Sequence, residues 1–412
     1  MVEAAGWLEV PPGHPFGLQT LPYGSFTTAG RLGQPRVGVA IGDQVLDLTT
    51  AADRLLTSRA DLFMGGRLDP LLDAGDRAWA QIRAAVTAWL SRDGYRDAIE
   101  DLLVPAAAVT LHLPFRVHDY VDFYASEHHA SNVGQIVRPG SPPLTPNWRH
   151  LPAGYHGRSG TVVVSGTPMR RPYGQFRLPD GGGPGFGPSA RLDFEAELGF
   201  VVGVESMLCE PVSVDRFPEH VFGVCLVNDW SARDIQFWET TPLGPFLGKS
   251  FGTSISAWIL PLAALEHARV RPPSRDTELL PYLTESENWG LDIDFEVSLN
   301  GHVISRPPYA SMYWSPAQML AHMTVNGASL RTGDLFASGT ISGPVAGQRG
   351  CMLELTWGGA QPLTLADGSA RAWLEDSDEL IITATAAGPD GTRVGLGEAR
   401  GQILPPQNPT AL

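Results

Sequence analysis

The segment Val221-Phe-Gly-Val-Cys-Leu-Val-Asn-Asp229 decides the fold, because it is a short apolar run that ends abruptly in an asparagine and an aspartate. A run of this length and composition is typical of a buried strand. A carboxylate at the end of such a strand costs several kcal/mol if it has no partner. We therefore expect Asp229 to lie next to a cation.

Other short apolar runs lie on both sides of this strand, separated by Gly, Pro, Asn and Asp. Together with this strand, at 222–227, they cover residues 161–165, 198–204, 291–299, 353–357 and 379–385. Many short strands with turn residues between them favour an antiparallel or mixed barrel or sandwich over a doubly wound sheet. One helix is well marked, with Ser315 as its cap and Gln318 three residues later. The glycine-rich residues 180–187 are predicted to be a flexible loop, because no clear strand precedes them.

The N-terminal part of the chain has a different pattern. Residues 36–48 alternate apolar residues with small or polar ones around Gly42-Asp43, which predicts a hairpin. Residues 69–90 have the periodicity of a helix, and a second helical piece is expected at residues 95–103. The sequence thus begins with a small β-rich unit that is followed by helices.

Length and composition indicate a compact protein of two domains. A chain of 412 residues exceeds the size at which one hydrophobic core keeps growing. The change of pattern near residues 112–118 places the domains at 1–117 and 118–412. Apolar residues make up 43% of the chain and charged residues 18%, which excludes a disordered protein.

The net charge and the terminal and cysteine residues indicate which classes of partner are excluded and which cellular compartment is expected. A net charge of −15 repels phosphate backbones and anionic lipids, which excludes nucleic acid and membrane surfaces as partners. No stretch approaches the roughly 20 apolar residues of a membrane span, and the N-terminus lacks the basic start of a signal peptide, so we expect a cytoplasmic protein. The three cysteines, Cys209, Cys225 and Cys351, have no metal-type spacing and are predicted to be buried free thiols.

Carboxylates near the apolar runs indicate a metal site. If residues 193–197 form a strand, Asp193, Glu195 and Glu197 share one face of it. Such a face is either a solvated edge or a site for a hard divalent cation, for which carboxylate oxygens are the preferred ligands. Asp122 is a further candidate ligand. If its segment is helical, Asp122 lies on the same face as His129, seven residues later.

Candidates for catalysis are one of two adjacent histidines, one glutamate and one lysine. A histidine can serve as a general base near neutral pH, but chemistry alone does not separate His128 from His129. Glu354 lies inside an apolar run that we expect to be a strand, and its side chain either orients a histidine or faces outward. Lys249 is the single lysine among 29 basic residues, which suggests a site that requires a compact ammonium group.

Seven segments carry a resemblance to a known family. They are DFYASEHH (122–129), PNW (146–148), GYHGR (154–158), DFEAE (193–197), NDWSARDIQ (228–236), PLGPFLGK (242–249) and ASGTISGP (337–344). In these segments the chain closely resembles the fumarylacetoacetate hydrolase family. The resemblance extends from Leu21 to Glu398 and so covers almost the whole chain.

The resemblance implies a fold and a reaction. The implied fold is mainly β (α+β), with an N-terminal SH3-like barrel domain followed by a C-terminal mixed β-roll catalytic domain, in a homodimer. The implied reaction is the metal-dependent hydrolysis of a carbon–carbon bond of 4-fumarylacetoacetate, a small anionic diketo acid, to fumarate and acetoacetate. This is the final step of tyrosine and phenylalanine breakdown.

The resemblance also assigns site residues by their match to the family motifs. The implied ligands of Ca²⁺ or Mg²⁺ are Asp122, Glu195, Glu197 and Asp229. Lys249 and Thr253 would lie beside this metal, with a possible second cation near Asp229 and Thr253. The implied catalytic residues are His129 as base, Glu354 as its partner, Lys249, Arg233 and Gln236. The implied substrate-contacting residues are Tyr124, Arg138, Tyr155, Arg233, Gln236 and Thr340.

Two other functions remain open from the sequence. One is an acylpyruvate hydrolase or β-keto acid decarboxylase that uses the same metal; Arg138, Tyr155 and the N-terminal domain argue against it. The other is a calcium-binding protein without catalysis, which would not require His129 together with Glu354. Residues 139–146 and 181–187 depart from the family pattern, so closure of the site and substrate range can differ.

Overall fold

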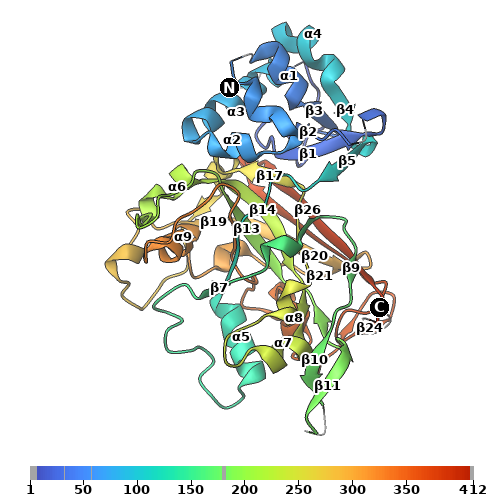
Figure 1. Cartoon of the computed structure of the whole chain (residues 1–412), viewed down its shortest axis with the longest axis vertical. Coiled ribbons are helices and arrows are strands. Elements are labelled where there is room, and N and C mark those ends of the chain that lie inside the picture. Colours follow the sequence, from blue (N-terminus) through green and yellow to red (C-terminus); the bar gives the residue numbers. More distant parts are fainter. Residues whose placement is uncertain (1–6, 32, 57, 179–181, 409–412) are drawn as a thin grey trace.

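The computed structural model describes residues 7–31, 33–56, 58–178 and 182–408. Figure 1 shows the N-terminal part, in blue, at one end of the long axis, with helices α1–α4 around its strands. The remainder of the chain, coloured from teal through green to red, forms the larger body. Helices α5, α7 and α8 lie at the end of the molecule opposite to the N-terminal part.

The N-terminal elements are β1 (Tyr23–Thr28), β2 (Arg36–Ile41), β3 (Gln44–Asp47), α1 (Leu48–Leu55), α2 (Asp69–Asp73), α3 (Asp76–Ser91), α4 (Arg96–Ile99), β4 (Leu103–Pro105) and β5 (Val109–His112). The later helices are α5 (Glu127–Val137), α6 (Phe217–His220), α7 (Arg233–Glu239), α8 (Leu247–Ser250), α9 (Pro316–Thr324) and α10 (Met352–Leu355).

The later strands fall into two groups along the chain. The first group is β6 (Tyr120–Phe123), β7 (Gly154–His156), β8 (Val162–Val164), β9 (Met169–Arg170), β10 (Tyr173–Arg177), β11 (Pro184–Pro188), β12 (Leu192–Asp193), β13 (Ala196–Val202), β14 (Val221–Asp229), β15 (Ser231–Ala232), β16 (Thr253–Ile255) and β17 (Trp258–Pro261). The second is β18 (Arg269–Val270), β19 (Gly290–Leu291), β20 (Ile293–Leu299), β21 (His302–Ser305), β22 (Leu335–Ala337), β23 (Leu363–Thr364), β24 (Ala370–Arg371), β25 (Glu379–Ala387) and β26 (Arg393–Leu404).

A large mixed sheet organises the molecule. Its main path is β4-β3-β2-β1-β17-β14-β13-β22-β6-β7, with β5 beside β1 and β16 between β14 and β8. Most pairs are antiparallel, but β22 with β6 and β16 with β8 are parallel. A second sheet has the order β21-β20-β25-β26-β9. The fold is therefore mixed, with α-helices and large mixed sheets, and the expectation of a mixed rather than doubly wound sheet is confirmed.

Strand β14 is buried on both faces, which explains its apolar sequence. Val224 and Leu226 belong to the core of the larger body, whereas Cys225 and Val227 belong to the core that includes the N-terminal helices. Successive side chains of a strand point to opposite faces, so each face contributes to one core. A strand with no solvated face needs no polar alternation.

The N-terminal part confirms the expected local elements but shows no closed barrel. Strands β2 and β3 form the predicted hairpin, with Gly42 at a positive φ of 53° in the turn. Its strands form an open path, β4-β3-β2-β1-β5, and no pairing between β4 and β5 closes it within the described residues. Strand β1 also pairs with β17, so the sheet continues into the larger body. The long predicted helix is interrupted at Gly75 and forms α2 and α3.

Two expected elements are wrong in type. The glycine-rich region was expected to be a loop, but β11 (Pro184–Pro188) pairs with β10 in a hairpin; residues 180 and 181 lie outside the described residues. Residues 353–357 were expected to form a strand, but Glu354 lies in helix α10. The Asp193 carboxylate accepts hydrogen bonds from the backbone N–H groups of Met352 and Leu353, at 2.6 and 3.0 Å, which stabilises this helical turn.

The structure also differs from the single helix that was considered for the segment from Asp122 to His129. This segment is not one helix: Asp122 lies in strand β6, and His129 lies in helix α5, which begins after the cap residue Ser126. The expected helix that follows Ser315 is confirmed as α9, with both hydrogen bonds of a capping box. Of the three cysteines, Cys225 and Cys351 are buried free thiols as expected, but Cys209 is exposed.

Candidate active site

Four carboxylates from neighbouring strands meet at one place in the large sheet. They are Asp122 in β6, Glu195 just before β13, Glu197 in β13 and Asp229 at the end of β14. One oxygen of each lies within 4.8 Å of the others, and all four residues are buried. Strands β14 and β13 are adjacent, and β22 separates β13 from β6. The sheet therefore brings together residues that are up to 107 positions apart in the sequence.

The cluster fits a hard divalent cation. Both oxygens of Glu197 are buried and have no hydrogen-bond partner among the described residues. Burial, together with the negative charges of Asp122, Glu195 and Asp229, raises the pKa of Glu197 well above its usual value. Burial likewise raises the pKa of Asp122. Oxygen ligands of this kind suit calcium or magnesium, and a cation there would relieve both the repulsion and the missing partners of Glu197.

Lys249 lies against this cluster. Its Nζ donates hydrogen bonds to Glu195 and Asp229 and lies 4.0 Å from Asp122 Oδ2. Burial alone would lower the pKa of Lys249, but Asp229, Glu195 and Asp122 outweigh it and raise that pKa. Lys249 is therefore a charged ammonium in contact with two of the four carboxylates.

Close packing of α8 against α7 places Lys249. A Cβ atom at Gly248 would lie 2.6 Å from the backbone nitrogen of Gln236, so only glycine allows this approach. At the start of α8, the Glu239 carboxylate accepts hydrogen bonds from the backbone N–H groups of Phe246 and Gly248, at 2.9 and 2.7 Å. The single lysine is thus held by contacts that its own sequence neighbourhood does not predict.

Arg233 forms a second cationic side of the cluster. Its guanidinium donates to Asp193 at 2.8 Å, to Glu195 at 2.7 Å and to Gln236 Oε1 at 3.1 Å. Burial would raise the pKa of Glu195, but Lys249 and Arg233 hold it well below its usual value.

Asp193 was expected on the same face as Glu195 and Glu197. The chain is irregular between β12 and β13, and Asp193 instead bonds Arg233 and the N-terminus of α10.

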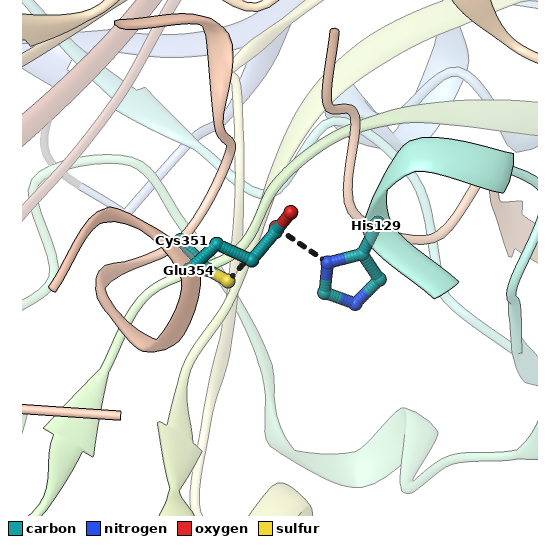
Figure 2. Close-up of side chains that lie close together, drawn as sticks. All are labelled: His129, Cys351 and Glu354. Carbon is teal, nitrogen blue, oxygen red and sulfur yellow. Dashed lines mark hydrogen bonds and ion pairs between the residues drawn. The ribbon is translucent and has the colours of Figure 1, made fainter. Parts of the chain in front are cut away.

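His129 and Glu354 form a buried pair beside the carboxylates (Figure 2). His129 Nδ1 lies 2.6 Å from Glu354 Oε2, and His129 Nε2 lies 4.0 Å from Glu195 Oε1. Ser126 accepts a hydrogen bond from the backbone N–H of His129 and so caps the first turn of α5, which positions the imidazole. Burial opposes ionisation of Glu354, but His129 and several hydrogen bonds lower its pKa.

Sequence reasoning missed the other partners of Glu354. Asn132 Nδ2 donates to Oε1 at 2.8 Å, and Ser342 Oγ donates to Oε2 at 2.8 Å. The thiol of Cys351 lies 3.2 Å from Oε2, and Figure 2 shows it together with His129 and Glu354. Asn132 follows His129 by three residues on α5, but it lies beyond the segment for which the sequence suggested a helix.

A cavity of about 470 Å³ opens onto these groups. Of the residues expected from the sequence, it is lined by Asp122, Tyr124, His129, Tyr155, Glu195, Glu197, Arg233, Gln236, Lys249 and Thr340. The Thr340 hydroxyl is buried and has no partner among the described residues, so it is available to a ligand. Val133 and Leu243 add apolar surface. This volume is within the usual range for a small-molecule site.

Four expected residues do not line the cavity: Arg138, Thr253, Glu354 and Asp229, of which Asp229 contacts the lining residue Lys249. Arg138 lies at the C-terminal end of α5, where its guanidinium donates to the backbone oxygen of Pro143 at 3.1 Å. Thr253 lies behind Asp229 and donates to its Oδ1 at 2.9 Å. Glu354 lies behind His129 and reaches the cavity only through the imidazole.

Family models match most of the chain. The model described as fumarylacetoacetate (FAA) hydrolase C-terminal matches residues 119–403, and the one described as fumarylacetoacetase N-terminal matches residues 19–114. The chain is 46% identical to the fumarylacetoacetase of Bos taurus over 405 residues, which cover 95% of this chain and 96% of that protein. It is 43% identical to the fumarylacetoacetase of Arabidopsis thaliana, with the same coverage.

The chain belongs to the fumarylacetoacetate hydrolase family. Solved structures with the same fold include a fumarylacetoacetate hydrolase from psychrophilic Exiguobacterium antarcticum, with a TM-score of 0.55, 16% identity and coverage of 93% of this chain and 99% of that one. Another is a protein described as a putative HpcE protein from Mycobacterium smegmatis, with a TM-score of 0.56, 17% identity and the same coverage. None of the described helices is both long and apolar enough to cross a membrane.

Proposed function

We propose that this enzyme hydrolyses the carbon–carbon bond of 4-fumarylacetoacetate to fumarate and acetoacetate, the final step of tyrosine and phenylalanine breakdown. The observation that carries the proposal is the joint placement of His129, Lys249 and three of the four carboxylates in the lining of one cavity, with Glu354 behind His129 and Asp229 behind Lys249. Full-length relatives named fumarylacetoacetase support this choice of substrate.

The proposed metal ligands are Asp122, Glu195, Glu197 and Asp229, and their buried oxygens support a calcium or magnesium ion. When bound, such an ion acts as a Lewis acid that stabilises negative charge on the oxygens of the substrate. Lys249 and Thr253 would lie beside it, because both contact Asp229. A second cation near Asp229 and Thr253 is part of the same proposal.

His129 is the proposed general base. Its Nδ1 faces Glu354, which leaves Nε2 toward the cavity to take a proton from a water molecule. That water adds to one carbonyl carbon of the diketo acid. The carbon–carbon bond then breaks, with its electron pair on the departing carbon as an enolate. The ionised Glu354 stabilises the imidazolium that forms on His129.

Cationic and amide donors are proposed to receive the developing charge. Lys249, Arg233 and Gln236 are directed at the cavity, where exclusion of water strengthens their interaction with an oxyanion. Lys249 is also the proposed source of the proton that completes the product carbon. Its compact ammonium on a flexible stem suits this role better than a guanidinium, which does not release a proton in proteins.

The proposed substrate contacts include Tyr124, Tyr155 and Thr340, which line the cavity, together with Arg233 and Gln236. Arg138 is also proposed to contact substrate, and it would do so from outside the present cavity lining. Family membership further supports a homodimer in the cytoplasm, with an N-terminal domain at residues 1–117 and a β-roll catalytic domain at residues 118–412.

The test is the loss of fumarylacetoacetate absorbance with purified protein, measured with magnesium or calcium, with chelator, and with two histidine variants. We expect rapid metal-dependent loss that His129→Ala abolishes. His128→Ala is the matched control, because His128 is the preceding residue and does not line the cavity. No turnover of this substrate by a metal-loaded protein would favour the acylpyruvate hydrolase or β-keto acid decarboxylase alternative. Equal losses in the two variants would remove His129 as the base.

A further inference from the structure

We propose that Asn132 is a positioning residue that acts on the base through Glu354, an inference that rests on the proposed function. Asn132 Nδ2 donates to Glu354 Oε1 at 2.8 Å, while His129 Nδ1 lies 2.6 Å from Glu354 Oε2. The two carboxylate oxygens are thus bound by two residues of one helix. Asn132 does not line the cavity, so it has no direct route to the substrate.

The geometry fixes the orientation of the Glu354 carboxylate. Oε2 has His129, Ser342 and Cys351 as neighbours at 2.6, 2.8 and 3.2 Å, so its position is determined by three groups (Figure 2 shows two of them). Asn132 is the one side chain recorded on Oε1 in the described part of the chain. The terminal torsion of a glutamate is broad, so the donor on Oε1 restricts rotation of the carboxylate about that torsion.

The helix connects Asn132 to the base. Residues three apart on an α-helix lie on the same face, so α5 presents His129 and Asn132 together to the short helix α10 that carries Glu354. Ser126 caps the same helix one turn earlier and holds the backbone of His129. Asn132 and His129 consequently contact the two oxygens of the carboxylate from fixed positions on one helix.

The loss of Asn132 has two consequences for Glu354. A buried carboxylate oxygen would be left without a donor, and the carboxylate could turn away from His129. Hydrogen bonds to charged groups are among the stronger ones in proteins, so we expect kcat to fall about 10- to 100-fold without this donor. Substrate is bound by other residues, so we expect KM to change by less than about twofold.

Two variants test this effect. Asn132→Leu has a similar volume and no donor, and Asn132→Asp keeps the shape but replaces the donor by an acceptor. We expect kcat to fall in both, with KM and the midpoint of metal binding unchanged. Ser131→Ala is the matched control, because Ser131 is the residue before Asn132 on the same helix and does not line the cavity. A fall in kcat no larger than that of Ser131→Ala would overturn the proposal.

A double-mutant cycle separates positioning from a structural role. If Asn132 acts only through Glu354, Asn132→Leu lowers kcat about 10- to 100-fold in the native background and less than about twofold in a Glu354→Gln background. Equal losses in the two backgrounds would show that Asn132 acts independently of Glu354.

A nuclear magnetic resonance measurement gives a readout that does not depend on activity. In ¹⁵N-histidine-labelled protein, the hydrogen bond to Glu354 predicts that His129 carries its proton on Nδ1, with a downfield proton resonance. We expect that signal to shift or weaken in Asn132→Leu and to stay unchanged in Ser131→Ala. An unchanged signal in Asn132→Leu refutes the positioning role. Failure of the native enzyme to hydrolyse fumarylacetoacetate would instead refute the proposed function.

Discussion

Replacement of Lys249 by methionine should destabilise the metal-free protein and increase the stabilisation that a divalent cation provides. Methionine keeps an unbranched side chain that is one heavy atom shorter than that of lysine, and it removes the charge. In the native protein, Lys249 is buried at 6% exposure and donates to Glu195 and Asp229. Without the ammonium, Arg233 is the one cationic side chain among the described residues that still donates a hydrogen bond to either carboxylate. It donates to Glu195 and not to Asp229.

The magnitude follows from the burial of the pairs. Removal of one partner from a buried ion pair costs about 3–5 kcal/mol, and partial protonation of the remaining carboxylates places the effect near the lower end of that range. An unfolding entropy of about 2.1 cal/mol/K per residue over 412 residues gives roughly 0.9 kcal/mol/K, so about 3 kcal/mol lowers Tm by about 3–4 °C.

Thermal unfolding with chelator and with saturating calcium or magnesium measures both effects. We expect Tm of Lys249→Met to be lower than that of the native protein in chelator, and the difference to shrink when metal is added, because the cation then balances the carboxylates. If the two proteins have the same Tm in chelator, Lys249 does not balance the cluster charge. If the difference is the same with and without metal, the cation does not bind at this cluster.

Two further predictions concern charge. Lys249→Arg should retain metal binding, measured by calorimetry, but lose turnover of fumarylacetoacetate, because a planar guanidinium cannot replace the ammonium; an active arginine variant would refute this. Glu285 is a separate case, in which burial raises the pKa to about 7 from 4.5. Because the folded-state pKa is raised, this group lowers stability as the pH rises from 4.5 through 7, by up to about 3 kcal/mol. Glu285→Gln should therefore be more stable than the native protein at pH 8 in denaturant unfolding, with the gain fading toward pH 4.5. A gain that is equal at both pH values would contradict this assignment.

Much of the local structure was predictable from the sequence. The hairpin at β2 and β3 follows from alternation around a glycine turn, and α9 follows from its capping residues. Both depend on interactions between residues that are close in the chain. Misassignments arose where tertiary contacts decide the element. Glu354 lies in a short apolar run that periodicity does not assign to helix or strand, and the Asp193 carboxylate selects the helical turn.

The identities of the chemical groups could also be read from the sequence, since a carboxylate that ends an apolar strand needs a cation wherever that strand lies. The arrangement of these groups could not be read in this way. Asp122 and Asp229 reach one cluster because β22, from a much later part of the chain, pairs with both β13 and β6. It thereby brings β6, which carries Asp122, into the same sheet as β14, which carries Asp229. The pairing of His129 with Glu354, 225 residues away, and the grip of Asn132 on the second oxygen depend on the packing of α5 against α10. Strand order and helix packing are non-local properties, and so the tertiary structure alone decided which of the candidate residues meet.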